Sequence, residues 1–273
     1  LSFFVIAALW VHQFSMQSYL RLYAAEPDEL LGMVDVDDYS GASQLTAVSK
    51  SAAKLGIRQG MTVAQGRVRG AELRIIVRST GADVEAKKRL ARILAGFSPV
   101  FELGEESERG WAYLDLRGLE RLFGSYGALR NDLLKTLMDE GFEARCAIAG
   151  TRALARALTL GGGGLFERLD EALLALAGMP LKVLEPSDAL GAIARRFGVE
   201  AIREFLALPL ESVAEHMGDE ALLLYRLARG EETESGVLSR EEQEGFRAEA
   251  YFEDSLQSVP QLMACLGDLV GRV

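Results

Sequence analysis

The sequence predicts an α+β protein built on a ferredoxin-like βαββαβ unit, and three observations support this fold class. Over the first 160 residues, apolar patterns follow the order strand, helix, strand, strand, helix, strand once residues 16–74 are set aside. Residues 16–74 carry short strand and helix patterns of their own, as an insertion after the first strand would. Beyond a glycine run at residues 161–164 the pattern becomes helical with short loops, which predicts a small all-helical domain.

The first predicted element is a central strand at residues 3–10, which is wholly apolar. It is too short for a membrane span, which needs roughly 18 apolar residues, and no basic residue precedes it as in a signal peptide. The other elements of the unit are predicted at residues 83–97 (helix), 100–103 and 111–116 (strands), 127–140 (helix) and 142–149 (strand), followed by a helix at 151–160.

The insertion is predicted to contain strands at residues 30–36, 44–48 and 73–78, and helices at 49–55 and 61–68. In the helical domain we expect helices at residues 187–196, 199–206, 210–216 and 219–229. No Gly-Lys-Ser/Thr follows the glycine run, so a phosphate-binding P-loop is excluded and a flexible hinge is expected there. The apolar pattern resumes at Tyr251 and continues to Val273 without a stop signal, so we expect the protein to extend further.

The composition, with 49% hydrophobic and 26% charged residues, is typical of globular proteins. The length of 273 residues is enough for two domains. The net charge of −10 excludes indiscriminate binding to nucleic acid, but the charge is unevenly spread. Residues 50–92 hold eleven Lys/Arg against three Asp/Glu and can meet phosphate, whereas residues 166–254 hold nine against twenty. The cysteines, Cys146 and Cys265, lack metal-like spacing and indicate a reducing compartment.

Three local motifs add to this topology. Residues 45–61 combine a helical stretch with the pattern Gly-hydrophobic-x-x-Gly-Met, residues 111–115 have the sequence Trp-Ala-Tyr-Leu-Asp, and residues 145–156 form a strand–turn–helix. In this order and spacing the motifs resemble those of the Y-family translesion DNA polymerases, over residues 3 to about 230. The resemblance implies a palm from residues 1–15 and 75–161, fingers from 16–74, a helical thumb from 166–232, and the start of a little-finger domain at 246–273.

Active Y-family members hold two Mg²⁺ ions with an Asp near the end of the first strand and an Asp-Glu pair on the palm hairpin, because the metals must bind triphosphate and primer oxygen together. Those positions are identified here as Val11 and as Gly110 and Trp111, so every implied carboxylate ligand is replaced. A large indole cannot share its position with a hydrated metal ion, so we expect Trp111 to be at least half buried near the Val11 end of the strand. These losses imply no catalytic residue, no metal and no other cofactor.

The implied nucleotide grip is also incomplete. The Tyr and Arg that hold the triphosphate in active members fall on Lys50 and Ala53, while Arg156 replaces a palm-helix Lys and keeps its charge. One cation without metals cannot organise phosphoryl transfer. The Gly-x-Gly hairpin of the thumb is not evident, and Leu190-Gly191-Ala192 is its nearest remnant. The residues that stay candidates for weak DNA contact are Lys50, Lys54, Arg58, Arg152 and Arg156.

The remaining acidic and histidine residues give weaker signals. Asp35, Asp37 and Asp38 mark a strand-to-turn junction, where Asp is a common turn former, so a metal site there is disfavoured. His12 and His216 are far apart in the sequence, and ordinary packing or surface roles are favoured over catalytic pairing.

Further patterns occur at residues 97–99 (Phe-Ser-Pro), 114–118 with 122–124, and 206–209 before Met217-Gly218. Together with the lost ligands they resemble one subfamily, the bacterial ImuB-type proteins. This resemblance implies a non-catalytic adaptor in DNA-damage-induced (SOS) mutagenic translesion synthesis and DNA repair, in the bacterial cytoplasm near the nucleoid and away from membranes. It implies as partners the sliding clamp, an error-prone C-family DNA polymerase and a RecA-like accessory protein.

The clamp-binding segment of such proteins is expected beyond residue 273. Residues 261–266 (Gln-Leu-Met-Ala-Cys-Leu) superficially resemble a clamp-binding peptide, but they lack its terminal aromatic residue and fall on a helical apolar pattern. Core packing is therefore favoured for them.

Two alternative functions stay open. An active translesion polymerase would use Mg²⁺ held by displaced carboxylates, at least two of which would meet beside the first strand, and we expect none there. Asp115 is a poor substitute because it lies roughly 16 Å along the strand from Gly110 and on its other face, and active members carry an Asp there besides their catalytic pair. A DNA-binding module without partners would need a continuous basic channel, which the acidic C-terminal half disfavours.

Overall fold

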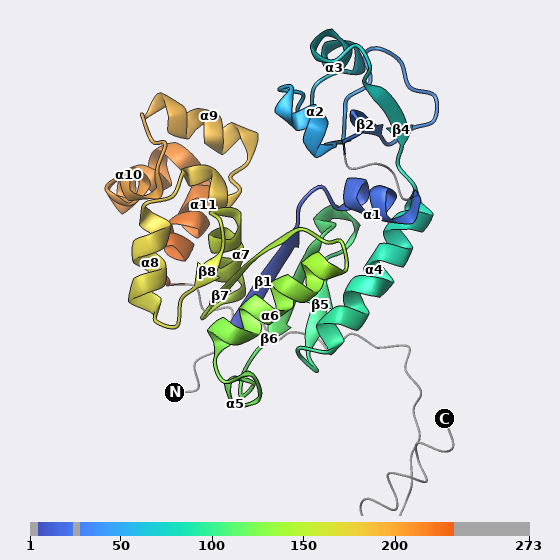
Figure 1. Cartoon of the computed structure of the whole chain (residues 1–273). Coiled ribbons are helices and arrows are strands. Elements are labelled where there is room, and N and C mark those ends of the chain that lie inside the picture. The colour runs from blue at the N-terminus through green and yellow to red at the C-terminus, as the bar shows by residue number, and fades with distance from the viewer. Residues whose placement is uncertain (1–4, 24–27, 232–273) are drawn as a thin grey trace, which may run out of the picture. The chain divides into compact units, whose positions relative to one another are not determined.

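The computed structural model describes residues 5–23 and 28–231, and Figure 1 shows this part of the chain as two sheets with helices packed on them. The predicted little-finger start at residues 246–273 lies outside the described residues, and with it the peptide at 261–266 and Cys265. The α+β fold class is confirmed in the described part.

The larger sheet has five strands in the order β5-β6-β1-β7-β8. Its central strand β1 (Ile6–Val11) runs antiparallel to β6 (Trp111–Asp115) on one side and to β7 (Ala144–Ala149) on the other. β5 (Phe101–Leu103) pairs with the far edge of β6. The four strands of the predicted ferredoxin-like unit are therefore present in the expected arrangement.

The fifth strand, β8 (Gly164–Leu165), corrects the expected hinge at the glycine run. β8 pairs in parallel with β7, so the sheet includes residues 164–165, which lie beyond the predicted palm boundary at residue 161. Gly163 has a φ of +86°, and a Cβ atom on it would lie 2.5 Å from the carbonyl oxygen of Cys146. The glycines thus allow the chain to close directly against β7, which is a packing role.

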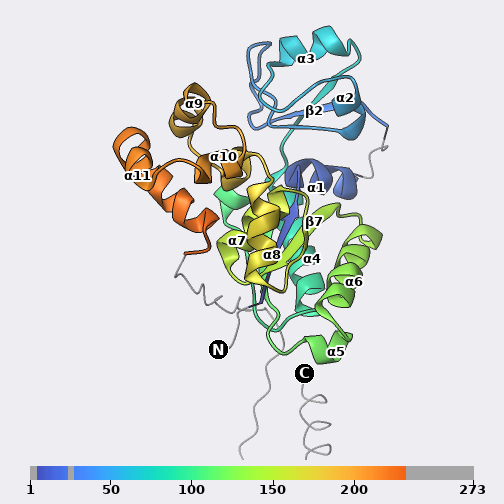
Figure 2. The same cartoon turned by 90° about the vertical axis from the view of Figure 1, so that its left-hand side faces the viewer.

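The two faces of the five-stranded sheet carry different helices (Figure 2). On one face, α4 (Thr80–Ala95) and α6 (Tyr126–Asp139) bury their leucines against Ala7, Leu9 and Val11 of β1. On the other face, α7 (Arg152–Leu160) packs near Ala8 of β1 and Tyr113 of β6. Because successive side chains of a strand point to opposite faces, neighbouring residues of β1 belong to two different cores.

Two further helices of this region were not predicted. α1 (Phe14–Tyr23) begins directly after β1 and packs against α4, although its residues lie in the segment assigned to the insertion. Gln13, just before it, has a φ of 54°, which turns the chain sharply from strand to helix. α5 (Glu120–Phe123) is a single turn and too short to give a periodic signal.

The inserted segment (residues 28–78) contains a three-stranded sheet in the order β3-β2-β4. Its strands are β2 (Leu31–Val34), β3 (Ala47–Val48) and β4 (Arg74–Val77), and its helices are α2 (Lys50–Lys54) and α3 (Val63–Arg69). Both helices begin where the sequence predicts, because Ser49 and Thr62 accept hydrogen bonds from the backbone amides of Ala52 and Gln65. A separate small core, which includes Val34, Leu45 and Ile57, holds the segment together.

The helical segment (residues 166–231) follows β8 and shares the core that lies under α7. α9 (Asp188–Arg196) and α10 (Ile202–Leu206) match predicted helices, while α8 (Leu169–Ala177) and the 3₁₀ turn η2 (Leu181–Leu184) are additions. The two helices predicted at 210–216 and 219–229 form one helix, α11 (Leu210–Ala228), kinked at Gly218, whose φ is 81°. In the described residues no helix is long and apolar enough to cross a membrane.

Candidate functional site

Three aromatic side chains line one face of the five-stranded sheet where β1 meets β6. Trp10 lies directly opposite Trp111 in the strand register, and their rings stack with centroids 5.7 Å apart and planes 15° apart. Tyr113, two residues along β6, continues the stack at 6.0 Å from Trp111. Trp111 is only 5% exposed, so the prediction that it is at least half buried is confirmed.

The residue of β1 that shares this face is Trp10, which the sequence analysis did not single out. Val11, the position that the resemblance assigns to the first metal-binding Asp, is fully buried on the opposite face, beneath α4 and α6. The difference follows from strand geometry, because neighbouring residues of a strand point to opposite faces. The alternation of side chains along β1 is the signal that would have located Trp10.

Gly110 admits no side chain in this fold. Its φ is +83°, and a Cβ atom there would lie 2.3 Å from the carbonyl oxygen of Val11. The amide of Val11 also donates a 2.8 Å hydrogen bond to the carbonyl of Gly110, which fixes the two strands at this point. A carboxylate at position 110 would require the backbone itself to move.

Arg156 of α7 covers the aromatic face. Its guanidinium lies 4.2 Å from the centre of the Trp111 ring, a cation–π contact, and donates a 2.6 Å hydrogen bond to the Tyr113 hydroxyl. The same guanidinium donates at 2.7 Å to Glu108 and at 2.5 Å to Glu185. Two carboxylates therefore neutralise the one cation that the resemblance assigns to phosphate binding.

The ionisation of this cluster follows from its contacts. Burial alone would lower the pKa of Arg156, but its hydrogen bonds to Glu185 and Tyr113 raise that pKa above its ordinary value. Burial also raises the pKa of Tyr113, although the charge of Arg156 opposes this. At physiological pH the Arg156 guanidinium therefore stays charged and the Tyr113 phenol stays neutral.

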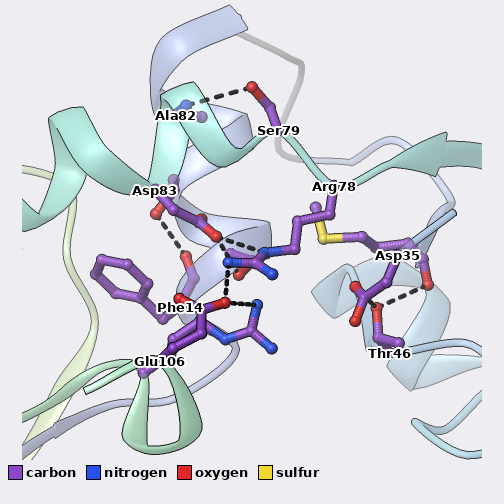
Figure 3. Close-up of polar contacts among 12 residues, drawn as sticks. Phe14, Asp35, Thr46, Arg78, Ser79, Ala82, Asp83 and Glu106 are labelled. Atoms are coloured by element: carbon purple, nitrogen blue, oxygen red, sulfur yellow. Dashed lines mark hydrogen bonds and ion pairs between the residues drawn. The ribbon is translucent and has the colours of Figure 1, made fainter. Parts of the chain in front are cut away.

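A second polar cluster lies where the inserted segment returns to the five-stranded sheet. Figure 3 shows Arg78 between Asp83 and Glu106. Arg78 Nε donates to Asp83 Oδ2 at 2.6 Å, and Arg78 Nη2 donates to Glu106 Oε1 at 2.6 Å. Asp83 Oδ2 also accepts a 2.9 Å bond from Ser15 Oγ. The network joins α1, α4 and the turn before β6.

Two cavities open beside the aromatic face. One, of about 220 Å³, is lined by apolar side chains such as Phe14 and Leu90 and by several charged ones, namely Arg78, Asp83, Lys87, Glu105, Glu106 and Arg109. The other, of about 200 Å³, lies between Trp10 and the inserted segment and has a single carboxylate in its wall, Asp35, which accepts a 2.9 Å hydrogen bond from Thr46. Of the three carboxylates that line the first cavity, Asp83 and Glu106 both accept hydrogen bonds from Arg78, so their charges are already paired.

The residues of this face do not fit the two Mg²⁺ ions of active Y-family members. Indoles stand at positions 10 and 111 and a glycine at 110, and none of these offers a hard oxygen ligand from its side chain. Asp115, which the sequence already disfavours as a substitute ligand, binds Arg117. Partial burial would raise the Asp115 pKa, but the hydrogen bonds from the Arg117 side chain and amide lower it. Among the described residues, no three His, Cys, Asp or Glu side chains lie close enough to share a metal ion.

The five candidates for DNA contact do not form one surface. Lys54 is exposed on α2, Lys50 pairs with Glu143, and Arg58 donates to the backbone carbonyls of Ala53 and Ile57. Arg152 pairs with Glu102 and lies 3.8 Å from the centre of the Tyr113 ring, and Arg156 is held as described above. Among the three on the inserted segment, Lys54 is exposed, whereas Lys50 and Arg58 must give up these contacts to bind phosphate.

The two histidines have separate surroundings. His12 lies edge-on to Trp10 at 6.1 Å between ring centroids, while His216 stacks on Phe197 in the helical segment. Burial lowers the pKa of His12, and Glu143 opposes that change. These contacts are packing roles of the kind that the sequence favours.

Comparison with known proteins agrees with this architecture. Residues 26–159 match the family described as IMS, impB/mucB/samB. The insertion ternary complex of Dbh DNA polymerase matches 84% of this chain and 68% of its own, with a TM-score of 0.71 and 18% identity. DinB from Sulfolobus solfataricus matches 83% and 67%, with a TM-score of 0.69 and 17% identity.

These similarities define a class: the chain has the palm-and-fingers fold of the Y-family DNA polymerases. The match of residues 26–159 to the impB/mucB/samB family model lies within this fold. Over 173 residues, 63% of its length, the chain is 32% identical to Protein ImuB of Caulobacter vibrioides strain NA1000 / CB15N, and equally to Protein ImuB of strain CB 15. It spans 37% of the length of those relatives.

Proposed function

We propose that this chain is the polymerase-like part of a non-catalytic adaptor in DNA-damage-induced (SOS) mutagenic translesion synthesis and DNA repair. The observation that carries the proposal is the aromatic filling of the face between β1 and β6, where Trp10 stacks on Trp111. The identity with Protein ImuB supports it, and because the chain spans about a third of that protein, the activity of the whole is part of the proposal.

The absence of catalysis follows from what phosphoryl transfer requires. The reaction depends on metal ions and cations that neutralise charge on the transferred group. Here the nearby carboxylates Glu106 and Glu108 accept from arginines, and Arg156 is itself paired with two carboxylates. Around β1 and β6 in the described part of the chain, Arg156 and these carboxylates therefore bind one another, which supports the proposal that they do not hold metal ions or a triphosphate.

As partners we propose the sliding clamp, an error-prone C-family DNA polymerase and a RecA-like accessory protein, on the basis of the resemblance to ImuB-type proteins. We propose a cytoplasmic, nucleoid-associated location in bacteria on the same basis. DNA would be bound weakly, through Lys50, Lys54 and Arg58 of the inserted segment.

Primer extension tests the central claim. Purified protein is incubated with a primed template, deoxynucleotides and either Mg²⁺ or Mn²⁺, beside an active polymerase and a mock purification from cells that lack the gene. We expect no extension above the mock. Template-dependent extension by the pure protein would support the alternative, an active translesion polymerase that uses Mg²⁺ held by displaced ligands.

A binding experiment tests the adaptor role separately. The full-length protein is immobilised, and purified sliding clamp, C-family polymerase and RecA-like protein are passed over it one at a time. We expect each to bind, and Trp111→Glu to leave clamp binding intact because Trp111 is only 5% exposed and offers almost no surface to a partner. Failure of all three to bind would refute the adaptor role and leave a DNA-binding module without partners.

A further inference from the structure

One short turn carries two carboxylates that bind arginines in opposite parts of the fold. The 3₁₀ turn η1 (Glu106–Glu108) lies between β5 and β6, immediately before Gly110. Glu106 accepts from Arg78 at the end of the inserted segment, and Glu108 accepts from Arg156 of α7. One turn thus binds an arginine at the end of the inserted segment through Glu106 and an arginine of α7 through Glu108.

The first contact connects the inserted segment. Arg78 directly follows β4, its side chain is 14% exposed, and it binds Asp83 of α4 as well as Glu106. Arg109 adds a second cation 3.3 Å from the same Glu106 oxygen. A side chain held by two carboxylates while mostly buried has little freedom, so the chain leaving β4 is fixed to the sheet at this point.

The second contact connects the helical segment. Glu185 closes the turn η2, and its carboxylate accepts from Arg156, which also binds Glu108. Glu185 has φ 53° and ψ 48°, a left-handed backbone that costs a non-glycine residue free energy. Such strain persists only where other contacts hold it, and here these include the bond to Arg156 and a 3.0 Å bond from the Glu185 amide to the Lys182 carbonyl.

From these contacts we infer that the turn at residues 105–109 is a clasp that holds the inserted segment, the five-stranded sheet and the helical segment in one fixed arrangement without DNA. Glu106 and Arg78 form its first arm, and Glu108, Arg156 and Glu185 form its second. The clasp goes beyond the adaptor proposal and does not depend on it, because it concerns the arrangement of the fold and not the partners.

The two arms are separable. Glu106 and Glu108 bind different arginines, and among the described residues no hydrogen bond or ion pair joins Arg78 to Glu108 or Arg156 to Glu106. Loss of Glu106 should therefore loosen the inserted segment alone, which keeps the Arg78–Asp83 pair and its packing on α1. Loss of Glu185 should loosen the helical segment alone, which keeps the apolar core that it shares with α7. A ligand that withdraws Arg156 from Glu185 would loosen only that arm.

Distances between spin labels test the clasp in the full chain. The labelled cysteines replace Val68 in the inserted segment, Met138 in α6 and Leu174 in the helical segment, which are 88%, 66% and 79% exposed. Cys265 is replaced by Ser, while Cys146 is fully buried and should not react. One pair, 68 and 138, reports on the first arm, and the pair 174 and 138 reports on the second.

In the parent protein both pairs should give one narrow distance distribution. Glu106→Gln should broaden only the 68–138 distribution, and Glu185→Gln only the 174–138 distribution, each by at least roughly twofold in width. Glu105→Gln is the matched control, because Glu105 lies on the same turn and is exposed, and it should change neither. Arg156→Lys should broaden the 174–138 distribution as Glu185→Gln does. The ammonium group of lysine lacks the planar fork of donors with which a guanidinium binds two carboxylates.

Two results would overturn the inference. If Glu106→Gln, Glu185→Gln and Arg156→Lys all give the distributions of Glu105→Gln, the turn holds nothing in place. If any one of them broadens both distributions equally, the segments are not held by separate arms. Circular dichroism of each variant verifies that the elements themselves stay folded, so that a broadened distribution reports on arrangement.

Discussion

Trp10 and Trp111 stand opposite each other on neighbouring antiparallel strands, with ring planes only 15° apart and centroids 5.7 Å apart. The Arg156 guanidinium lies 4.2 Å from the centre of the Trp111 ring. The contact converts a face that a metal-dependent polymerase keeps polar into a packed, cation-capped aromatic layer. Its consequences for stability and chemistry can be measured directly.

Replacing Trp111 by Glu should destabilise the protein without creating activity. The change exchanges a side chain that is 5% exposed for a carboxylate buried against Trp10. Lost packing and burial of an unmatched charge should cost roughly 2–4 kcal/mol of unfolding free energy. Chemical denaturation followed by far-ultraviolet circular dichroism measures the loss. Trp111→Phe, which keeps an aromatic ring, should lose less, and a midpoint unchanged by Trp111→Glu would show that the face is not packed.

Replacing Gly110 by Ala should cost more than the same change at Gly118. Both glycines have positive φ angles, 83° and 77°, but only Gly110 faces an obstacle, the Val11 carbonyl oxygen. The strained backbone alone costs about 1 kcal/mol, which is the loss expected for Gly118→Ala. The added clash should raise the loss for Gly110→Ala to about 3 kcal/mol or more. Equal denaturation midpoints for the two variants would contradict the close approach of these strands.

The partly buried His12 should make the protein less stable in mild acid. Burial holds its pKa below the ordinary 6.5, with Glu143 opposing, so the unfolded chain binds the proton more readily than the folded one. The stabilisation is present in full above pH 6.5 and is lost as the pH falls through the folded pKa. Between pH 7 and pH 5, the unfolding free energy of the His12→Asn variant should therefore fall less than that of the parent protein. Parallel pH curves for the two proteins would exclude His12 as a contributor.

DNA binding, if carried by the inserted segment, should be weak and sensitive to salt. Each phosphate contact releases counterions, so reversing Lys50, Lys54 and Arg58 to Glu should lower affinity for all sequences and reduce the salt slope by roughly 2. Lys50→Glu alone should have the smallest effect, because Lys50 is already paired with Glu143. Fluorescence anisotropy over a salt series measures both quantities.

The control for this experiment removes the same net charge from other exposed positions, by reversing Lys135, Arg168 and Arg229 to Glu. An equal loss of affinity in both triple variants would mean that overall charge, and not the inserted segment, determines binding.

Much of the fold was predictable because it depends on local patterns. The order of strands and helices in the ferredoxin-like unit follows from apolar periodicity, and the starts of α2 and α3 follow from Ser49 and Thr62 as capping residues. The loss of side-chain carboxylates at positions 110 and 111 is likewise a property of the sequence. The short elements α5 and β8 were missed because a few residues carry no periodic signal, and Gly164 pairs with β7 only once the chain has closed.

What the sequence by itself determined is which elements form, in what order, and that the expected metal ligands are missing. The tertiary structure decided which side chains meet. It placed Trp10, and not Val11, beside Trp111, because sheet register and not sequence position determines which face a strand residue occupies. It also brought Glu185 to Arg156 across 29 positions of the chain, a contact with no local pattern that could announce it. Such pairings depend on the packing of whole segments, and for that reason they emerge only in the folded chain.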